Sequence, residues 1–162
     1  MKGIEPIIAA VLLIAISVAG IAIVLENGRA SVSRLNEVGL YNEAKDVLAQ
    51  IGGAIEAVAS EGEGSTRVLS LSITGGDYDA DASSDTVSFY MDSPSQLVGD
   101  GVVKTEDGIE IIGMKRSVAM KLSYSSIDIT GGYGFGAGHR SLVVKNGGYN
   151  ESLGKLAIEV SD

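Results

Sequence analysis

An uncharged apolar run near the N-terminus constrains this chain more than any other feature. It extends from Pro6 to Leu25 and reads PIIAAVLLIAISVAGIAIVL, with Glu5 before it and Glu26 after it. At a rise of about 1.5 Å per residue, a helix of this length matches the hydrocarbon thickness of a bilayer, about 30 Å. A cleaved signal peptide has a shorter apolar stretch followed by small residues, which Leu25-Glu26-Asn27 does not supply. The run therefore predicts a membrane-inserting helix that stays in the mature chain.

The charges around this run predict its orientation. Lys2 precedes it, so the positive-inside tendency keeps the start of the chain in the cytoplasm and places the rest outside. Glu5 lies at the edge of the run, where an unpaired carboxylate is costly to carry into hydrocarbon. Glu5 either stays at the headgroup level in the first helical turn, where the helix dipole favours an anion, or pairs with a cation when the helix leaves the membrane. Pro6 fits the first turn under both interpretations.

The helical pattern continues beyond the run and becomes amphipathic. No proline interrupts it, and the stretch Glu61-Gly62-Glu63-Gly64 is the expected end. The sequence thus predicts one long helix, with an apolar part over 1–25 and an amphipathic part over 26–61. Five glycines are expected weak points of this helix, namely Gly20, Gly28, Gly39, Gly52 and Gly53. The predicted apolar stripe of the second part consists of Val32, Leu35, Val38, Val47, Leu48, Ile51, Ile55 and Val58.

From Arg67 onward the apolar period changes from 3.6 to 2. Alternation over 67–74, 85–91 and 117–124, with shorter runs near 109–111, 127–129, 142–144 and 156–160, predicts seven or eight short strands. Glycine pairs and Asp-Gly or Asn-Gly steps separate these runs. We expect an α+β fold, in which the long N-terminal helix packs on a C-terminal antiparallel β-sandwich over 62–162. The amphipathic part of the helix is expected to share one core with the sheet.

Composition excludes several classes of function. The chain has 162 residues, with 12 Lys+Arg against 21 Asp+Glu and a net charge of −9, and no basic cluster is present to bind nucleic acid. It has no Cys, which excludes disulfide frameworks and thiol nucleophiles, and its one His is too few for a histidine metal cluster. No nucleophile–base pair stands out either, so we do not expect an enzyme.

An acidic segment, GGDYDADASSD, is a candidate metal site. Asp77, Asp79, Asp81 and Asp85 occupy positions 1, 3, 5 and 9 of a calcium-loop-like pattern. The pattern lacks the glycine and the glutamate that such a loop needs at positions 6 and 12, so a solvated acidic loop is the alternative to bound Ca²⁺.

Two further segments are of interest. The glycine-rich stretch 131–138 is not followed by a helix that could point amides at a phosphate, so we expect a hairpin tip that exposes Tyr133 and Phe135. Asn150-Glu151-Ser152 is an N-glycosylation sequon in a glycine-rich setting typical of an exposed turn, and Asn150 is therefore a candidate modification site.

The first residues resemble the N-terminus of archaeal type IV pilins. In that family a Lys/Arg-Gly step, a branched residue and Ser-Pro precede a run of Leu, Ile, Val and Ala. Here Lys2-Gly3-Ile4-Glu5-Pro6 precedes such a run, with Glu5 in place of the serine. The resemblance covers residues 2–25. The related archaellins also begin with Gly-Ile but usually lack the proline, so Pro6 favours a pilin over an archaellin.

The resemblance implies a structural role in a filament. Family members are inserted in the cytoplasmic membrane as prepilins, and a prepilin peptidase removes a short basic leader. Assembly machinery then bundles the apolar helices into the core of an extracellular filament that serves in surface adhesion. The matching leader would be Met1-Lys2-Gly3, with Gly3 and Ile4 flanking the cut. Alternatively Met1 is the mature first residue, in which case Glu5 stands where bacterial pilins have a carboxylate that pairs with a terminal amine.

Helices in such a bundle need close packing, because both lipid and bundle are apolar. The small residues Ala15, Ala19 and Gly20 are therefore candidate assembly residues, and the resemblance adds Glu5 and Pro6. The leading hypothesis is a homo-oligomeric pilus subunit, which passes through the membrane before assembly. The alternatives are an archaellin and a monomeric, membrane-anchored surface binding protein.

Overall fold

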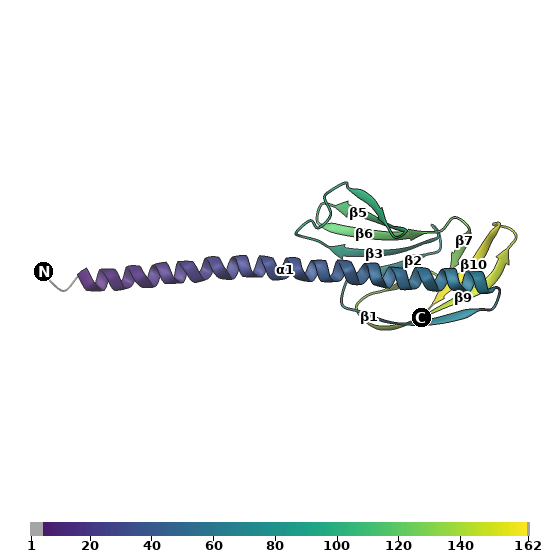
Figure 1. The fold of residues 1–162 in the computed structure, drawn as a ribbon, viewed down its shortest axis with the longest axis horizontal. Helices are drawn as coiled ribbons and strands as arrows, with labels where there is room; N and C mark the ends of the chain where they lie inside the picture. The colour runs from purple at the N-terminus through teal and green to yellow at the C-terminus, as the bar shows by residue number, and fades with distance from the viewer. Residues whose placement is uncertain (1–4, 162) are drawn as a thin grey trace. The chain divides into compact units, whose positions relative to one another are not determined.

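The chain forms one helix and ten strands in the part that the structure describes. The computed structural model describes residues 5–161, without the side chains of Glu5, Pro6 and Ala30. Two compact units divide the chain, Met1–Asn36 and Glu37–Asp162. The helix is α1 (Glu5–Glu61), and the strands are β1 (Thr66–Ile73), β2 (Asp77–Asp81), β3 (Thr86–Asp92), β4 (Val103–Glu106), β5 (Ile109–Met114), β6 (Ser117–Ser123), β7 (Ile127–Thr130), β8 (Tyr133–Phe135), β9 (Gly138–Asn150) and β10 (Lys155–Ser161) (Figure 1).

Helix α1 ends at the predicted residue. Gly62 and Gly64 follow it with φ angles of 95° and 85°, a left-handed conformation that glycine adopts without strain. The Asn146 amide and the Ser65 hydroxyl both donate to the Val58 carbonyl at 2.8 Å, which satisfies a carbonyl that has lost its partner in the helix. The helix is continuous through all five of its glycines, so none of these weak points breaks it.

The strands form two sheets. One has the order β1-β9-β10-β7 and the other the order β4-β5-β6-β3-β2-β8. Neighbouring strands are antiparallel except for β7 and β10, which pair in parallel. The predicted α+β fold with a β-sandwich is therefore confirmed, with one parallel pair and with three strands, β2, β4 and β8, that the sequence patterns did not indicate.

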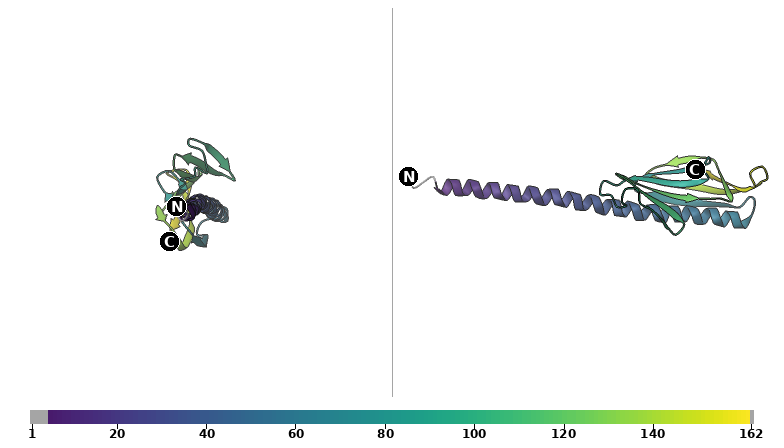
Figure 2. Two further views of the ribbon diagram at one scale, coloured as in Figure 1. Left: turned by 90° about the vertical axis from the view of Figure 1, so that its left-hand side faces the viewer. Right: turned by 90° about the horizontal axis from the view of Figure 1, so that it is seen from above.

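The second part of α1 lies in one core with both sheets. Figure 1 shows β3, β5 and β6 on one side of this part of the helix and β1 on the other, and Figure 2 shows the helix running alongside the strands. Contacts agree with this arrangement, because Gly52 packs against Leu122 of β6 while the Val58 carbonyl binds Asn146 of β9. The fully buried helix residues are Ala44, Leu48, Ile51, Ile55 and Val58.

The structure corrects part of the predicted stripe. Val47, Leu48, Ile51, Ile55 and Val58 are buried as expected, whereas Val32, Leu35 and Val38 remain 57 %, 70 % and 39 % exposed. The second compact unit accordingly begins at Glu37.

The acidic segment and the glycine-rich segment are also more ordered than predicted. Asp77–Asp81 is a strand, in which Tyr78 and Ala80 point into the core between outward-facing carboxylates. The prediction that Phe135 is exposed at a hairpin tip is wrong. Phe135 is buried in β8 and stacks on Tyr78 with ring centroids 5.2 Å apart, because the glycines of 131–138 flank a short edge strand.

Two adjacent glycines of α1 give a test of this packing. Alanine is favoured over glycine in a helix by about 1 kcal/mol. A Cβ on Gly53 meets no atom within 4 Å, whereas one on Gly52 lies 3.2 Å from Leu122 Cδ1. We expect Gly53→Ala to raise the free energy of unfolding of the fragment 37–162 by about 0.5–1 kcal/mol. Gly52→Ala should give a smaller gain or a loss, since Leu122 must move. Urea unfolding of both variants measures the difference, and equal gains would contradict the described contact.

Candidate functional site

The first part of α1 is an apolar surface on all sides. From Ile7 to Leu25 twelve large aliphatic residues are 53–70 % exposed, although the core residues of the same helix are fully buried. This segment is long and apolar enough to cross a membrane. Ser17 does not interrupt the apolar surface, because its hydroxyl donates to the Leu13 carbonyl at 2.8 Å within the helix.

Three of the predicted assembly residues, Ala15, Ala19 and Gly20, are small and leave low points between the large aliphatic side chains of this surface. Ala15 and Ala19 are four residues apart and therefore share one face of the helix, while Gly20 faces another side. No atom lies within 4 Å of the position that a Cβ on Gly20 would take. The structure describes the helical backbone of Glu5 and Pro6 but not their side chains, and the predicted processing residues Gly3 and Ile4 lie outside the described residues.

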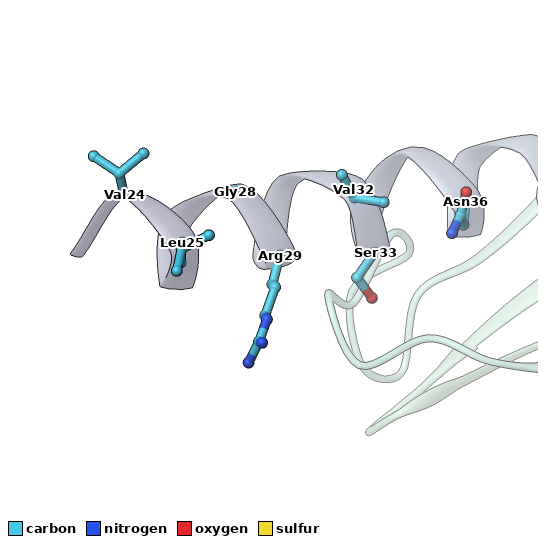
Figure 3. A pocket seen from close by; sticks show the side chains of 7 residues that line it. All are labelled: Val24, Leu25, Gly28, Arg29, Val32, Ser33 and Asn36. Carbon is cyan, nitrogen blue, oxygen red and sulfur yellow. The ribbon is translucent and has the colours of Figure 1, made fainter. Parts of the chain in front are cut away.

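A shallow groove lies at the C-terminal end of the apolar segment and is lined by residues between Val24 and Asn36. Figure 3 shows Gly28 between Val24 and Val32 on one ridge, with Arg29 projecting from the neighbouring ridge. The groove has a volume of about 670 Å³. Its seven lining residues are Val24, Leu25, Gly28, Arg29, Val32, Ser33 and Asn36. Sequence reasoning named Gly28 only as a weak point of the helix, and it did not identify this surface.

The four aspartates of the predicted metal loop do not come together. No group of three or more His, Asp or Glu side chains within the described residues could hold a metal ion. The Asp81 carboxylate accepts hydrogen bonds from the hydroxyls of Ser83 and Ser84, both at 2.7 Å, and these bonds lower the pKa of Asp81 to about 2. The carboxylate of Asp81 therefore orders the β2–β3 turn.

Asp85 connects this turn to the other sheet. Its side chain receives the Lys155 ammonium at 2.5 Å and the Ile129 backbone amide at 3.0 Å, and these contacts lower the pKa of Asp85. Lys155 and Ile129 belong to β10 and β7, whereas the turn joins β2 and β3. Asp85 thus has a structural role in holding the two sheets together, and the sequence pattern did not indicate it.

The sequon residue Asn150 ends β9 and opens the turn to β10. Its side-chain oxygen accepts the Ser152 hydroxyl at 2.7 Å and the Ser152 backbone amide at 3.1 Å. Asn150 is partly exposed and Glu151–Gly154 are exposed, so the turn lies at the surface as predicted.

Two polar contacts within the second compact unit were not found from the sequence. Glu37 is buried, and its Oε2 accepts hydrogen bonds from the hydroxyls of Ser93 and Ser95 at 3.0 and 2.6 Å. Glu106 of β4 receives the ammonium groups of Lys104 and Lys45 at 2.5 and 2.7 Å. Both contacts join α1 to a segment more than fifty residues away in sequence, and no local pattern marks such partners.

Comparison with known proteins adds no relative: no family model, curated protein or solved structure matches this chain. Its function is therefore argued from its own residues.

The Glu106 contacts predict how stability depends on pH. Hydrogen bonds from Lys104 and Lys45 lower the pKa of Glu106 to about 2, from an ordinary value of 4.5. A lowered folded-state pKa stabilises the protein above pH 4.5, and this contribution is lost as the pH falls toward 2. We expect Glu106→Gln to lower the melting temperature of the fragment 37–162 at pH 6. The further fall in melting temperature between pH 4.5 and pH 2 should be smaller in this variant than in the unmodified fragment. Thermal melts at several pH values measure this.

Glu110 provides the matched control for this experiment. It lies on the neighbouring strand β5 and forms no ion pair within the described residues. In Glu110→Gln the melting temperature should fall between pH 4.5 and pH 2 by as much as in the unmodified fragment. Identical pH profiles for the two variants would show that the Lys–Glu106 contacts do not contribute.

Proposed function

We propose that this chain is the structural subunit of an extracellular filament of the archaeal type IV pilus kind, whose apolar helices bundle into the filament core. The observation that carries the proposal is the exposed aliphatic surface of α1 from Ile7 to Leu25. The same helix continues without interruption into the core of the second compact unit, 37–162, which we call the head. The exposed aliphatic surface requires either lipid or other helices around it.

Two features favour bundling over a simple anchor. Aliphatic residues stay exposed beyond the apolar run, at Val32 and Leu35, where charged neighbours make lipid an unsuitable environment. Ala15, Ala19 and Gly20 allow other helices to approach closely, and close packing is what drives helix association from lipid. A simple anchor needs neither feature.

Burial of the apolar helix would make the filament very stable in water. Each large aliphatic side chain contributes about 1.5–3 kcal/mol when it is removed from water, so twelve of them contribute tens of kcal/mol before opposing terms. Adhesion to surfaces, rather than swimming, is the role that we propose for such a filament, because Pro6 follows the pilin pattern.

Electron cryo-microscopy of material sheared from producing cells tests this function. We expect filaments with a packed helical core whose density fits this chain, and the first residue in that density identifies the processing site. If the sheared fraction contains none of the chain and detergent extracts it as a monomer from membranes, the filament proposal fails and a membrane-anchored binding protein is the better description.

A change that keeps the helix apolar separates insertion from bundling. Gly20→Leu should leave membrane insertion intact, because it adds apolar volume, but it should block close helix packing and strongly reduce the sheared filaments. Leu12→Ile is the control, since it preserves volume at an exposed position of the same helix. Quantitative immunoblots of the membrane and sheared fractions compare the two, and equal filament yields would argue against helix bundling.

A further inference from the structure

Arg29 is an exposed cation in the shallow groove along α1. Within the described residues it forms no ion pair and no hydrogen bond, and it lines the groove beside Leu25 and Val32 (Figure 3). A Cβ at the adjacent Gly28 would meet no atom within 4 Å. A helical glycine costs about 1 kcal/mol relative to alanine, and no contact within the chain uses the space that Gly28 leaves. The groove therefore fits a partner that approaches closely and carries negative charge.

Lipid hydrocarbon does not meet this description, and headgroup phosphates would match the charge of Arg29 but would not cover the exposed aliphatic side chain of Val32. The run that ends at Leu25 already has the length of the bilayer hydrocarbon, and Glu26, Arg29 and Arg34 follow it. Charged side chains at this spacing belong outside the hydrocarbon, where exposed aliphatic residues are covered by protein. The partner of the groove is thus a protein surface.

The head carries an acidic groove of complementary chemistry. It lies between α1 and β1, has a volume of about 510 Å³, and contains the carboxylates of Glu43 and Asp46. Glu43 accepts the Thr74 backbone amide at 2.6 Å, whereas Asp46 is exposed and has no hydrogen-bond or ion-pair partner within the described residues. The other lining residues are Gly39, Asn42, Val47, Gln50, Ser70, Leu71 and Ser72.

The helix wall of this acidic groove is open to close approach. Gly39 lies in it, and a Cβ at Gly39 would again meet no atom within 4 Å. By contrast, the buried Gly52 of the same helix has Leu122 at 3.2 Å, so its lack of a side chain is explained within the chain. Four glycines of α1, Gly20, Gly28, Gly39 and Gly53, have no atom within 4 Å of the position that a Cβ would take, and two of them, Gly28 and Gly39, line grooves whose charged residues have opposite sign.

We propose that the Arg29 groove of one copy binds the acidic groove of a second copy, with Arg29 facing Asp46 and Glu43. Charge complementarity favours a second copy as occupant, because the chain has a net charge of −9 while the charged residue among those that line this groove is Arg29. The two grooves are different surfaces of one chain, so the contact is heterologous. Heterologous contacts that do not close into a ring produce open helical polymers.

This inference deepens the proposed filament function, since both require copies of the chain side by side. It adds a specific contact between the helix of one subunit and the head of the next, outside the apolar bundle. A filament held by the apolar helices alone would not need it, so the two proposals can fail separately.

Cysteine cross-linking of the full chain tests the contact directly, because the chain contains no Cys of its own. We expect oxidation of cells that produce an Arg29→Cys/Asp46→Cys variant to give a ladder of disulfide-linked multimers, since each copy links to the next. The control is Arg29→Cys/Glu56→Cys, because Glu56 is exposed on the same helix but does not line the groove. It should give no ladder.

A charge exchange provides the second readout. We expect Arg29→Glu alone and Asp46→Arg alone each to lower the sheared, sedimenting fraction about tenfold, and the double exchange to restore it to within about twofold. If the targeted cysteine pair gives no ladder in either membranes or sheared material, and the double exchange restores nothing, the inference is overturned. Filaments seen by microscopy in that case would leave the proposed function standing, whereas their absence would remove both.

Discussion

The fold depends on one constraint: a single uninterrupted helix must satisfy two environments. From Ala44 to Val58 it supplies fully buried side chains that fill the space between two sheets. From Ile7 to Leu25 it exposes side chains of the same kind. Helix formation requires the same backbone hydrogen bonds in both parts, so the distinction comes only from what surrounds the side chains. The head provides cover for one part, and the other part must find its cover outside the chain.

Electrostatic contacts in the head complement this apolar packing. Glu37 and Lys45 of α1 reach the 93–95 segment and β4, while Asp85 joins the β2–β3 turn to β7 and β10. Lys45 and Lys155 in these contacts remain partly exposed, whereas Glu37 is buried and its carboxylate accepts hydrogen bonds from two serine hydroxyls. These contacts fix the position of loops and edge strands that bury too little apolar surface to be held by packing alone.

Much of this architecture could be predicted from the sequence. The long apolar run, its amphipathic continuation and the Gly62-Gly64 stop are local signals, and they gave the helix with its correct end. The sandwich followed from period-2 alternation in β1, β3 and β6. The Asp77–Asp81 strand was missed because its outward aspartates resemble a metal loop, although Tyr78 and Ala80 already alternate with them.

The rest could not be predicted, because it depends on pairs that only the fold brings together. Asp85 with Lys155 and Glu37 with Ser93 are far apart in sequence, and no spacing rule connects them. The exposure of Val32 and Leu35 was also hidden, since an apolar stripe does not reveal whether its cover comes from the same chain. The exposed groove at Gly28 follows from that exposure, and the sequence alone offered no sign of it.

The place of β10 determines the order in which the head can form. This strand is the last one of the described residues, yet it lies inside its sheet between β9 and β7. The ribosome therefore releases the apolar helix long before the strand that completes the sheet exists. During that interval β7 and β9 lack their shared neighbour, and the half of the core that rests on them stays open. The apolar part of α1 is therefore synthesised before the head can complete its core, so its exposed aliphatic surface needs cover while the head is still unfolded.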